Sequence, residues 1–331
     1  MPEPWTPDDV LALSGGFQEP CVVAAAAQLQ VFDALAGGPA AAPDLAARLG
    51  TDRRATAVLA DALAAMGLLV KEGESYALAP GVADTLTEAG PHSVLRMVQH
   101  RANCLRSWAR LAEVVRSGER AERGPSVLGE EGDRAAFIGA MADIAARTAP
   151  GLVAALGPPP FTHLLDVGGA SGSYTIAFLR AQPQARATLF DLPAVIPMAR
   201  RRLRQEGLLH RVGLAAGDYH ADPLPSGVDL AWVSAIIHQN SAEENRRLAR
   251  KVHAALDHGG RVLVRDVVME PGRARPAAGA LFAVNMLVNT PAGGTYTFDE
   301  IRGWLEDAGF ADVRLLRRHE AMDSVVGARK P

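Results

Sequence analysis

Cysteine is almost absent from this sequence. Only Cys21 and Cys104 occur among 331 residues, and neither belongs to a Cys-x-x-Cys pair. The common zinc and dithiol motifs are therefore excluded. Two isolated thiols suit a reducing compartment, so we expect a cytoplasmic protein. Because no cluster of histidines and carboxylates has ligand spacing, we predict no metal site.

An excess of positive charge and long apolar runs are also lacking. The net charge is −3, with 3 Lys and 31 Arg against 37 acidic residues. Proteins that bind nucleic acid or anionic membranes present a basic face, so we expect neither partner. We find no apolar run of the roughly 18 residues that a membrane span needs. The first 20 residues also lack the Arg-led apolar core of a signal peptide.

Apolar residues are plentiful, at 48% of the chain, and 331 residues suffice for two domains. The predicted secondary structure changes near residue 156, from mainly helices to alternating strands and helices. We predict a helical, winged-helix-like domain over residues 1–92, a helical bridge over residues 93–155 and an α/β domain over residues 156–331.

The first part shows three helical patterns followed by a hairpin. The helices are expected at Val22–Leu35, Pro43–Leu49 and Thr51–Met66, with Thr51 as an N-cap, and the hairpin at Leu68–Leu78. This order is typical of a winged helix and leaves two interpretations. One is DNA binding through the third helix, whose few basic residues are offset by acids. The other is an interaction module, in which an Ala-rich helix is buried against a partner chain.

The last part alternates strands and helices, which predicts a parallel sheet covered on both faces. A terminal pair of strands follows the last helix. The expected strands are His163–Val167, Ala187–Asp191, Val212–Ala216, Val228–Ile237, Arg261–Val268, Val313–Arg317 and Ser324–Ala328.

A glycine-rich turn follows the first of these strands, in the segment Asp166-Val-Gly-Gly-Ala-Ser-Gly172. Such a turn lets a ligand approach the main chain closely at a helix N-terminus. Asp191 ends the second strand, where an acid can hold two ribose hydroxyls. Asp218 follows the third strand, where a carboxylate can accept a hydrogen bond from an adenine amino group. These features together predict a nucleotide-type site.

Five motifs occur in order along the chain. They are Asp-Val-Gly-Gly-Ala-Ser-Gly (166–172), Phe-Asp-Leu-Pro (190–193), Gly-Asp-Tyr (217–219), Ile-Ile-His (236–238) and Asp-His-Gly-Gly-Arg-Val-Leu-Val (257–264). Together they resemble the S-adenosylmethionine (SAM)-dependent small-molecule O-methyltransferases related to plant caffeate and bacterial polyketide methyltransferases. The resemblance covers most of the chain, because that family also has an N-terminal winged-helix dimerisation domain.

The resemblance implies a methyltransferase-type Rossmann sheet whose last strand is antiparallel, and a homodimer formed by the N-terminal domain. It implies a SAM cofactor that leaves as S-adenosylhomocysteine, and a phenol or hydroxyquinone of secondary metabolism as substrate. The residues expected at the cofactor are Asp166, Gly168, Gly169, Gly172, Asp191, Leu192, Asp218, Tyr219 and Ser234.

His238 is the residue that we select as the general base. A positioned histidine can remove the proton of a phenol while the methyl group arrives. We expect His238 to end the fourth strand, at the carboxyl edge where open α/β sheets bind ligands. In the family an acid orients this base, and Asp266 on the fifth strand matches that position by spacing.

The sequence departs from the family at several positions. Ala170 replaces a frequent glycine, and we expect a negative φ there because an L-residue disfavours the left-handed region. Ser234 stands where many members have Lys or Arg. A second family acid is missing from residues 293–297, and the usual His-Asp-Trp is His238-Gln-Asn. Two explanations are open. In one, Gln239, Asn240 or Tyr296 forms a hydrogen bond to the substrate or to the base. In the other, the substrate hydroxyl is already acidic, so the base matters less and positioning does most of the work.

Two helices are candidates for the substrate walls, as in the family. Asn285 and Asn289 lie four residues apart, so their amides share a helix face beside the adaptable side chain of Met286. Phe137 and Met141, on the bridging helix, are candidates for the opposite wall.

Two other classes of function remain open. One is an enzyme on the same scaffold that methylates carbon or nitrogen, or rearranges its substrate without methyl transfer, which the altered acids suggest. The other is a DNA-binding or SAM-sensing regulator.

Overall fold

The computed structural model describes residues 4–122 and 124–331, which form two compact units. The first unit contains the chain up to Ala109 and Glu122–Asp143, and the second contains Arg110–Ala121 and Ile144–Pro331. The predicted bridge over residues 93–155 is thus divided between the two units.

The first unit is mainly helical and carries a small three-stranded sheet of order β1-β3-β2. Its elements are α1 (Pro7–Gly15), α2 (Gln18–Gln28), α3 (Val31–Leu35), β1 (Ala40–Ala41), α4 (Ala42–Leu49), α5 (Arg53–Ala65), β2 (Leu69–Glu72), β3 (Ser75–Leu78), α6 (Val82–Leu86), α7 (Leu95–Trp108) and the first half of α9 (Gly129–Leu156). The predicted hairpin is confirmed as β2 and β3.

Two local predictions in this unit were wrong. The single helix expected at Val22–Leu35 is divided, because Gln30 adopts φ 59 between α2 and α3. Asp52, not Thr51, caps α5: its carboxylate accepts the main-chain N–H of Ala55. Thr51 instead bonds the hydroxyl of Thr56.

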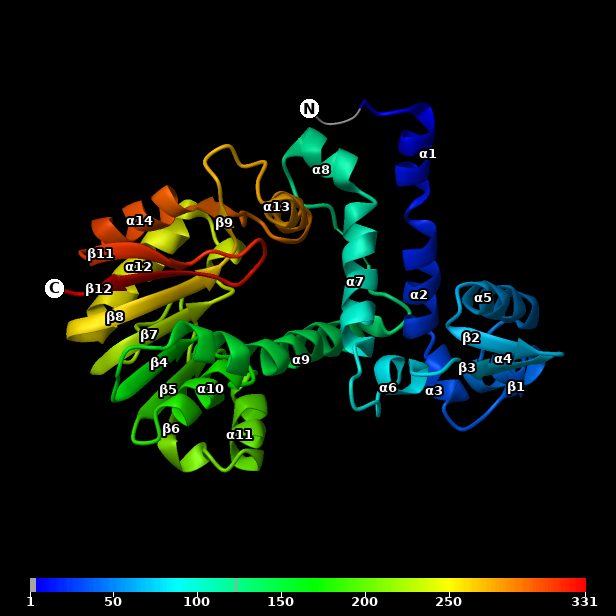
Figure 1. The fold of residues 1–331 in the computed structure, drawn as a ribbon, viewed down its shortest axis with the longest axis horizontal. Coiled ribbons are helices and arrows are strands. Elements are labelled where there is room, and N and C mark those ends of the chain that lie inside the picture. Colours follow the sequence, from blue (N-terminus) through cyan, green and yellow to red (C-terminus); the bar gives the residue numbers. More distant parts are fainter. Residues whose placement is uncertain (1–3, 123) are drawn as a thin grey trace. The chain divides into compact units, whose positions relative to one another are not determined.

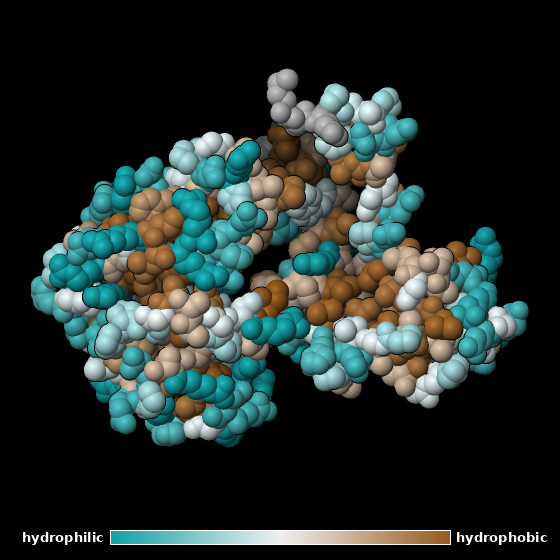
Figure 2. Space-filling model, viewed as in Figure 1, coloured by the Kyte–Doolittle hydropathy of each residue, from teal (hydrophilic) through white to brown (hydrophobic). Residues whose placement is uncertain are grey.

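The N-terminal helices expose apolar side chains. Val10, Leu13 and Phe17 recur at helical spacing and are 52%, 70% and 58% exposed. Figure 2 shows further apolar surface over the helical elements of this unit. The sequence led us to expect no segment of membrane-spanning length, yet the helical segment Pro7–Gln28 is long and apolar enough to cross a membrane, by length and composition alone. Buried core helices and signal sequences pass the same test, so it is weak evidence of a span.

The second unit is built on a seven-stranded sheet of order β11-β12-β8-β7-β4-β5-β6. β12 is antiparallel to its neighbour β8, whereas β8, β7, β4, β5 and β6 are parallel (Figure 1). The predicted methyltransferase-type sheet with an antiparallel last strand is confirmed. The strands are β4 (His163–Val167), β5 (Arg186–Asp191), β6 (Val212–Ala216), β7 (Val228–Ser234), β8 (Leu256–Asp266), β11 (Ala311–Arg317) and β12 (Ser324–Arg329).

Helices cover both faces of this sheet, because its central strands are apolar on both sides. One face buries Trp232, Leu230 and Leu164 under α10 and the second half of α9. The other buries side chains of β7 and β8 under α12 and α14. The helices of this unit are α8 (Leu111–Ser117), α10 (Ser173–Ala181), α11 (Ile196–Gln205), α12 (Ala242–Ala255), α13 (Ala277–Asn289), α14 (Phe298–Asp307), and the 3-10 turns η1 (Leu209–Arg211) and η2 (Ile237–Gln239).

The fourth strand is shorter than predicted. β7 ends at Ser234, because Ala235 adopts φ 56 and turns the chain away from the sheet. His238 lies in the following turn η2 rather than at the strand end. A further short pair joins β9 (Val268–Met269) to β10 (Tyr296–Thr297) in parallel.

Candidate active site

The glycine-rich turn between β4 and α10 lies close against the sheet. A Cβ at Gly168 would be 2.6 Å from Ile236, and one at Gly169 would be 2.6 Å from Leu189. Gly168 and Gly172 also have positive φ, of 65° and 79°. The glycines are therefore required for close packing of the turn. Through Ile236, the turn also contacts the segment that leads to His238.

Ala170 differs from our expectation, because its φ is +47° rather than negative. An L-residue pays about 1–2 kcal/mol in this region. The main-chain N–H of Ala170 donates to the Asp191 carboxylate at 2.7 Å, which holds the strained turn in place.

Asp191 links the turn to the end of β5. Its second oxygen accepts the N–H of Leu192 at 2.7 Å, so both oxygens bind main-chain donors. Each oxygen keeps acceptor capacity for another donor, as a pair of ribose hydroxyls would require. Leu192 beside it is 48% exposed, and offers an apolar surface at the same edge. Burial raises the pKa of Asp191 above its usual range.

Asp166 is buried below the turn. Its carboxylate accepts the hydroxyl hydrogen of Thr175 on α10 at 2.6 Å, which fixes the start of that helix. Burial raises the pKa of Asp166 to about 7, and the neighbouring Asp191 adds to the effect. Thr175 was not singled out from the sequence, although its place in the first turn of α10 is a signal for such a bond.

Asp218 and Tyr219, which were also predicted at the cofactor, both form hydrogen bonds within the protein. One carboxylate oxygen of Asp218 accepts the N–H of His220 at 2.8 Å. The Tyr219 hydroxyl donates to the side chain of Asn240 at 3.1 Å, so it holds the turn after η2.

Ser234 accepts a hydrogen bond from Arg265 at 3.1 Å. Arg265 is buried, pairs with Asp323 at 2.6 Å and lies over the ring of Tyr174. The guanidinium of Arg265 on β8 therefore places a positive charge beside Ser234, where many family members have Lys or Arg at the position of Ser234 itself. Sequence reasoning missed Arg265, because only the register of β7 and β8 aligns it with Ser234.

His238 and Asp266, predicted as a pair, are in contact. The imidazole Nδ1 lies 2.9 and 3.0 Å from the two carboxylate oxygens of Asp266. Both side chains are buried, and the N–H of Val267 donates to the same carboxylate. With its hydrogen on Nδ1, the imidazole presents a lone pair on Nε2. Phe282 on α13 packs edge-on against the ring, with centroids 4.9 Å apart.

The three residues that we considered as substitutes for the missing acid contact other groups. Gln239 donates its side-chain amide to the carbonyl of Ala235. Asn240 is buried and donates to Asn245 at 3.1 Å, and the Tyr296 hydroxyl donates to the Asn240 carbonyl at 2.5 Å. These bonds hold the main chain around His238 rather than its imidazole.

The candidate substrate residues of α13 do share a face. The Asn289 amide donates to both the carbonyl and the side chain of Asn285 at 3.0 Å. Met286 next to them is buried. Phe137 and Met141 lie on the first half of α9, in the other unit, where Phe137 is 44% exposed and packs against His100.

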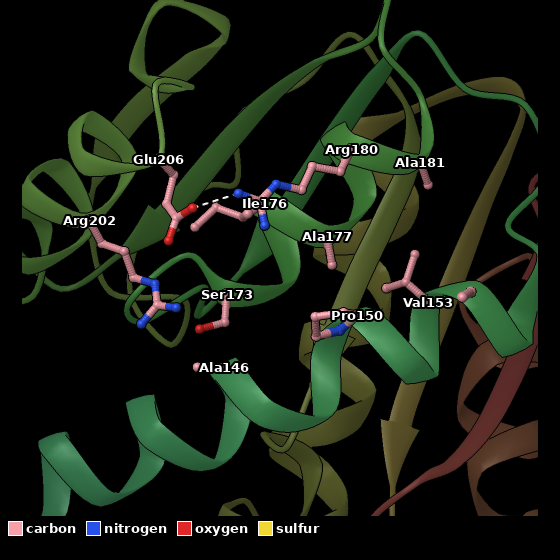
Figure 3. Close-up of a pocket in the computed structure, with 11 residues that line it drawn as sticks. Ala146, Pro150, Val153, Ser173, Ile176, Ala177, Arg180, Ala181, Arg202 and Glu206 are labelled. Atoms are coloured by element: carbon pink, nitrogen blue, oxygen red, sulfur yellow. Dashed lines mark hydrogen bonds and ion pairs between the residues drawn. The ribbon is translucent and has the colours of Figure 1, made fainter. Parts of the chain in front are cut away.

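A cavity of about 250 Å³ opens elsewhere on the second unit, between α9, α10 and α11 (Figure 3). Arg180 and Glu206 pair at 2.6 Å at its rim. The cavity contains none of the predicted site residues. Among the residues that the structure describes, no group of three or more metal-ligating side chains comes together.

Family models match both parts of the chain. An O-methyltransferase domain matches residues 108–311, and an O-methyltransferase dimerisation domain matches residues 11–89. The tetracenomycin polyketide synthesis 8-O-methyl transferase TcmO of Streptomyces glaucescens is 34% identical over 98% of this chain and 97% of its own. The 3-hydroxy-5-methyl-1-naphthoate 3-O-methyltransferase of Streptomyces sahachiroi is 34% identical over 92% of this chain and 90% of its own.

Solved structures resemble the whole fold. Human N-acetylserotonin methyltransferase in complex with SAM has a TM-score of 0.80 and 25% identity, covering 100% of this chain and 99% of its own. PigF with SAH has a TM-score of 0.85 and 25% identity, covering 98% of this chain and 100% of its own.

The sheet with its antiparallel last strand β12, the glycine turn and the acids beside that turn define a SAM-dependent methyltransferase. The chain belongs to the O-methyltransferase family, with the dimerisation domain of that family at its N-terminus. Its activity is that of a SAM-dependent O-methyltransferase of secondary metabolism.

Proposed function

We propose that the enzyme methylates a hydroxyl of a phenolic or hydroxyquinone-type small molecule, with His238 as the general base. The observation that carries this proposal is the buried contact between His238 Nδ1 and the Asp266 carboxylate, at 2.9 Å. Two relatives support the aromatic substrate, because their names specify a tetracenomycin polyketide and a hydroxynaphthoate.

The cofactor supplies an electrophilic methyl group on a sulfonium. On our proposal the turn at Gly168, Gly169 and Gly172 lets the cofactor approach the main chain closely, and Asp191 accepts hydrogen bonds from its ribose. Asp218 has one carboxylate oxygen without a bond from His220, which suits the adenine amino group. Leu192 offers an apolar wall.

The protein's own contribution is to position the substrate and move a proton. Asp266 fixes the tautomer of His238 by accepting the Nδ1 hydrogen, so that Nε2 accepts the proton of the substrate hydroxyl. The imidazolium formed in this step is stabilised by the adjacent carboxylate. Because His238 and Asp266 are both buried and Phe282 packs against the imidazole, this ion pair is stronger than in solution.

The test is the replacement His238→Ala, assayed by conversion of SAM to S-adenosylhomocysteine with a panel of hydroxynaphthoates and hydroxyquinones. We expect kcat to fall roughly 10²- to 10⁴-fold, the range for a general base. Calorimetry should give an unchanged affinity for S-adenosylhomocysteine. The matched control is His258→Ala, an exposed histidine at the opposite end of β8. Equal turnover in both variants would remove His238 from the mechanism.

We also propose that the enzyme is a homodimer joined through its N-terminal domain. The match to a dimerisation domain over residues 11–89 supports this proposal. The exposed apolar side chains of α1 are the surface that a second copy would cover.

A further inference from the structure

The segment that joins α13 to α14 runs across the main chain of the proposed base. We call residues 290–297 the strap. The N–H of Gly294 donates to the carbonyl of His238 at 2.9 Å. The N–H of Gly293 donates to the hydroxyl of Thr290, which itself bonds the end of α13. The strap therefore connects α13 to the turn that carries the imidazole.

Only glycine fits at the point of closest approach. A Cβ at Gly293 would lie 2.4 Å from the His238 carbonyl oxygen and 2.5 Å from the Thr290 hydroxyl. A Cβ at Gly294 would meet nothing within 4 Å. Neither glycine adopts a positive φ, so conformational freedom does not explain Gly293. Its missing side chain is what allows the strap to touch His238.

The C-terminal end of the strap contacts the main chain after His238 and the main chain after Asp266. Tyr296 donates its hydroxyl to the Asn240 carbonyl, two residues after His238. Tyr296 also pairs with Val268, two residues after Asp266. The strap thus fixes the main chain on either side of the contact between His238 and Asp266.

Tyr296 adds no charge to the segment from which the second family acid is missing. Burial and the nearby Glu300 raise the pKa of Tyr296 to about 12, so its hydroxyl is not ionised near neutral pH. It adds no negative charge beside the imidazole, and Asp266 is the carboxylate in contact with the ring.

We propose that the strap is a positioning device for the base, with Gly293 and Tyr296 as positioning residues. It holds His238 by its main chain, in the place where the family uses a second acid. This inference rests on the proposed role of His238. Displacement of the His238 carbonyl would move Nε2 away from the substrate hydroxyl, while the cofactor turn is unaffected.

The experiment compares Gly293→Ala with the matched control Gly303→Ala, using a hydroxynaphthoate that the wild type methylates. Gly303 lies on α14, outside the strap, and a Cβ there would meet nothing within 4 Å. Both variants keep their main-chain N–H. We expect kcat to fall about 10- to 100-fold in Gly293→Ala, the cost of misplacing a reacting group by about 1 Å. Gly303→Ala should stay within about twofold of the wild type, since nothing there resists a methyl group. Calorimetric affinity for S-adenosylhomocysteine should be unchanged in both.

A double-mutant cycle separates positioning from a general loss of structure. If Gly293 acts through His238, adding Gly293→Ala to His238→Ala should lower kcat no further. Additive losses would overturn the proposal. If Gly293→Ala does not fold, Tyr296→Phe tests the C-terminal end of the strap instead. This replacement should lower kcat several-fold in the wild-type background. It should not lower kcat when it is added to His238→Ala.

The failures of the two proposals are distinguishable. Full activity of His238→Ala would overturn the role of the base, and the strap proposal with it. A defective His238→Ala together with equal activities of the two glycine variants would overturn the strap alone.

Discussion

At the scale of single residues, the site depends on carboxylates with different surroundings. Asp266 contacts His238 and the N–H of Val267, whereas Asp166 has the hydroxyl of Thr175 and otherwise lies buried. Asp191 binds two main-chain donors at the edge of the sheet. The residue type does not predict these different surroundings, because all three residues are aspartates at or near the end of a strand.

Asp166 gives a prediction about stability and pH. Its pKa is about 7 in the fold and lies near 3.8 in the unfolded chain. The folded state therefore binds the proton more tightly, and its stability falls as pH rises from about 4 to about 7. We expect Asp166→Asn to gain stability relative to the wild type over this range, by at most about 4 kcal/mol.

Urea unfolding of both proteins without cofactor, at pH 5 and pH 8, measures this difference. The gain should be larger at pH 8, where the wild-type carboxyl carries its full burial cost. A difference that is independent of pH would show that Asp166 is not protonated preferentially in the fold.

At the scale of elements, α13 contributes to the site at several points. It carries Phe282 against the imidazole, and its last residues lead into the strap. Its amides at Asn285 and Asn289 are bonded to each other, so the pair is held rigidly on one face. Such a face is suited to bind substrate oxygens without a large loss of side-chain entropy.

We predict that Asn289→Ala weakens substrate binding more than cofactor binding. Loss of one hydrogen bond worth about 1 kcal/mol corresponds to a rise in KM of about fivefold for the aromatic substrate. The affinity for S-adenosylhomocysteine should not change. Gln205→Ala, on the exposed side of α11, is the control for steady-state kinetics. An unchanged KM in Asn289→Ala would assign the pair a purely structural role.

At the scale of the whole molecule, the apolar face that runs from α1 to the start of α2 needs an explanation. Three large side chains at helical spacing, Val10, Leu13 and Phe17, are more than half exposed. Contacts with a second copy would bury them, and the matched dimerisation domain includes two of the three positions.

We therefore predict that Phe17→Glu weakens association of the chain with itself. Burying a charge without a partner is costly, so the dimer should dissociate at micromolar concentrations. Light scattering should give twice the chain mass for the wild type and a lower mass for the variant. Leu316→Glu, exposed on the second unit, is the control and should remain dimeric. A monomeric wild type would contradict the prediction.

The sequence by itself determined the pattern of the α/β unit. Its strands are apolar runs, of which β5 and β8 end in an acid and β4 and β6 end directly before a glycine. Their order along the chain predicts the sheet, the cofactor turn and the acid beside it. The pairing of His238 with Asp266 was predicted from a family resemblance, in which an acid on the fifth strand orients the base.

Only the tertiary structure decided the main-chain details. Local patterns did not predict the left-handed conformations of Ala170, whose N–H donates to the Asp191 carboxylate, and of Ala235, where the chain leaves β7. Arg265 beside Ser234, and Gly293 against His238, join residues 31 and 55 positions apart. Contacts of that kind depend on strand register and on how closely two backbones approach, which no short stretch of sequence encodes.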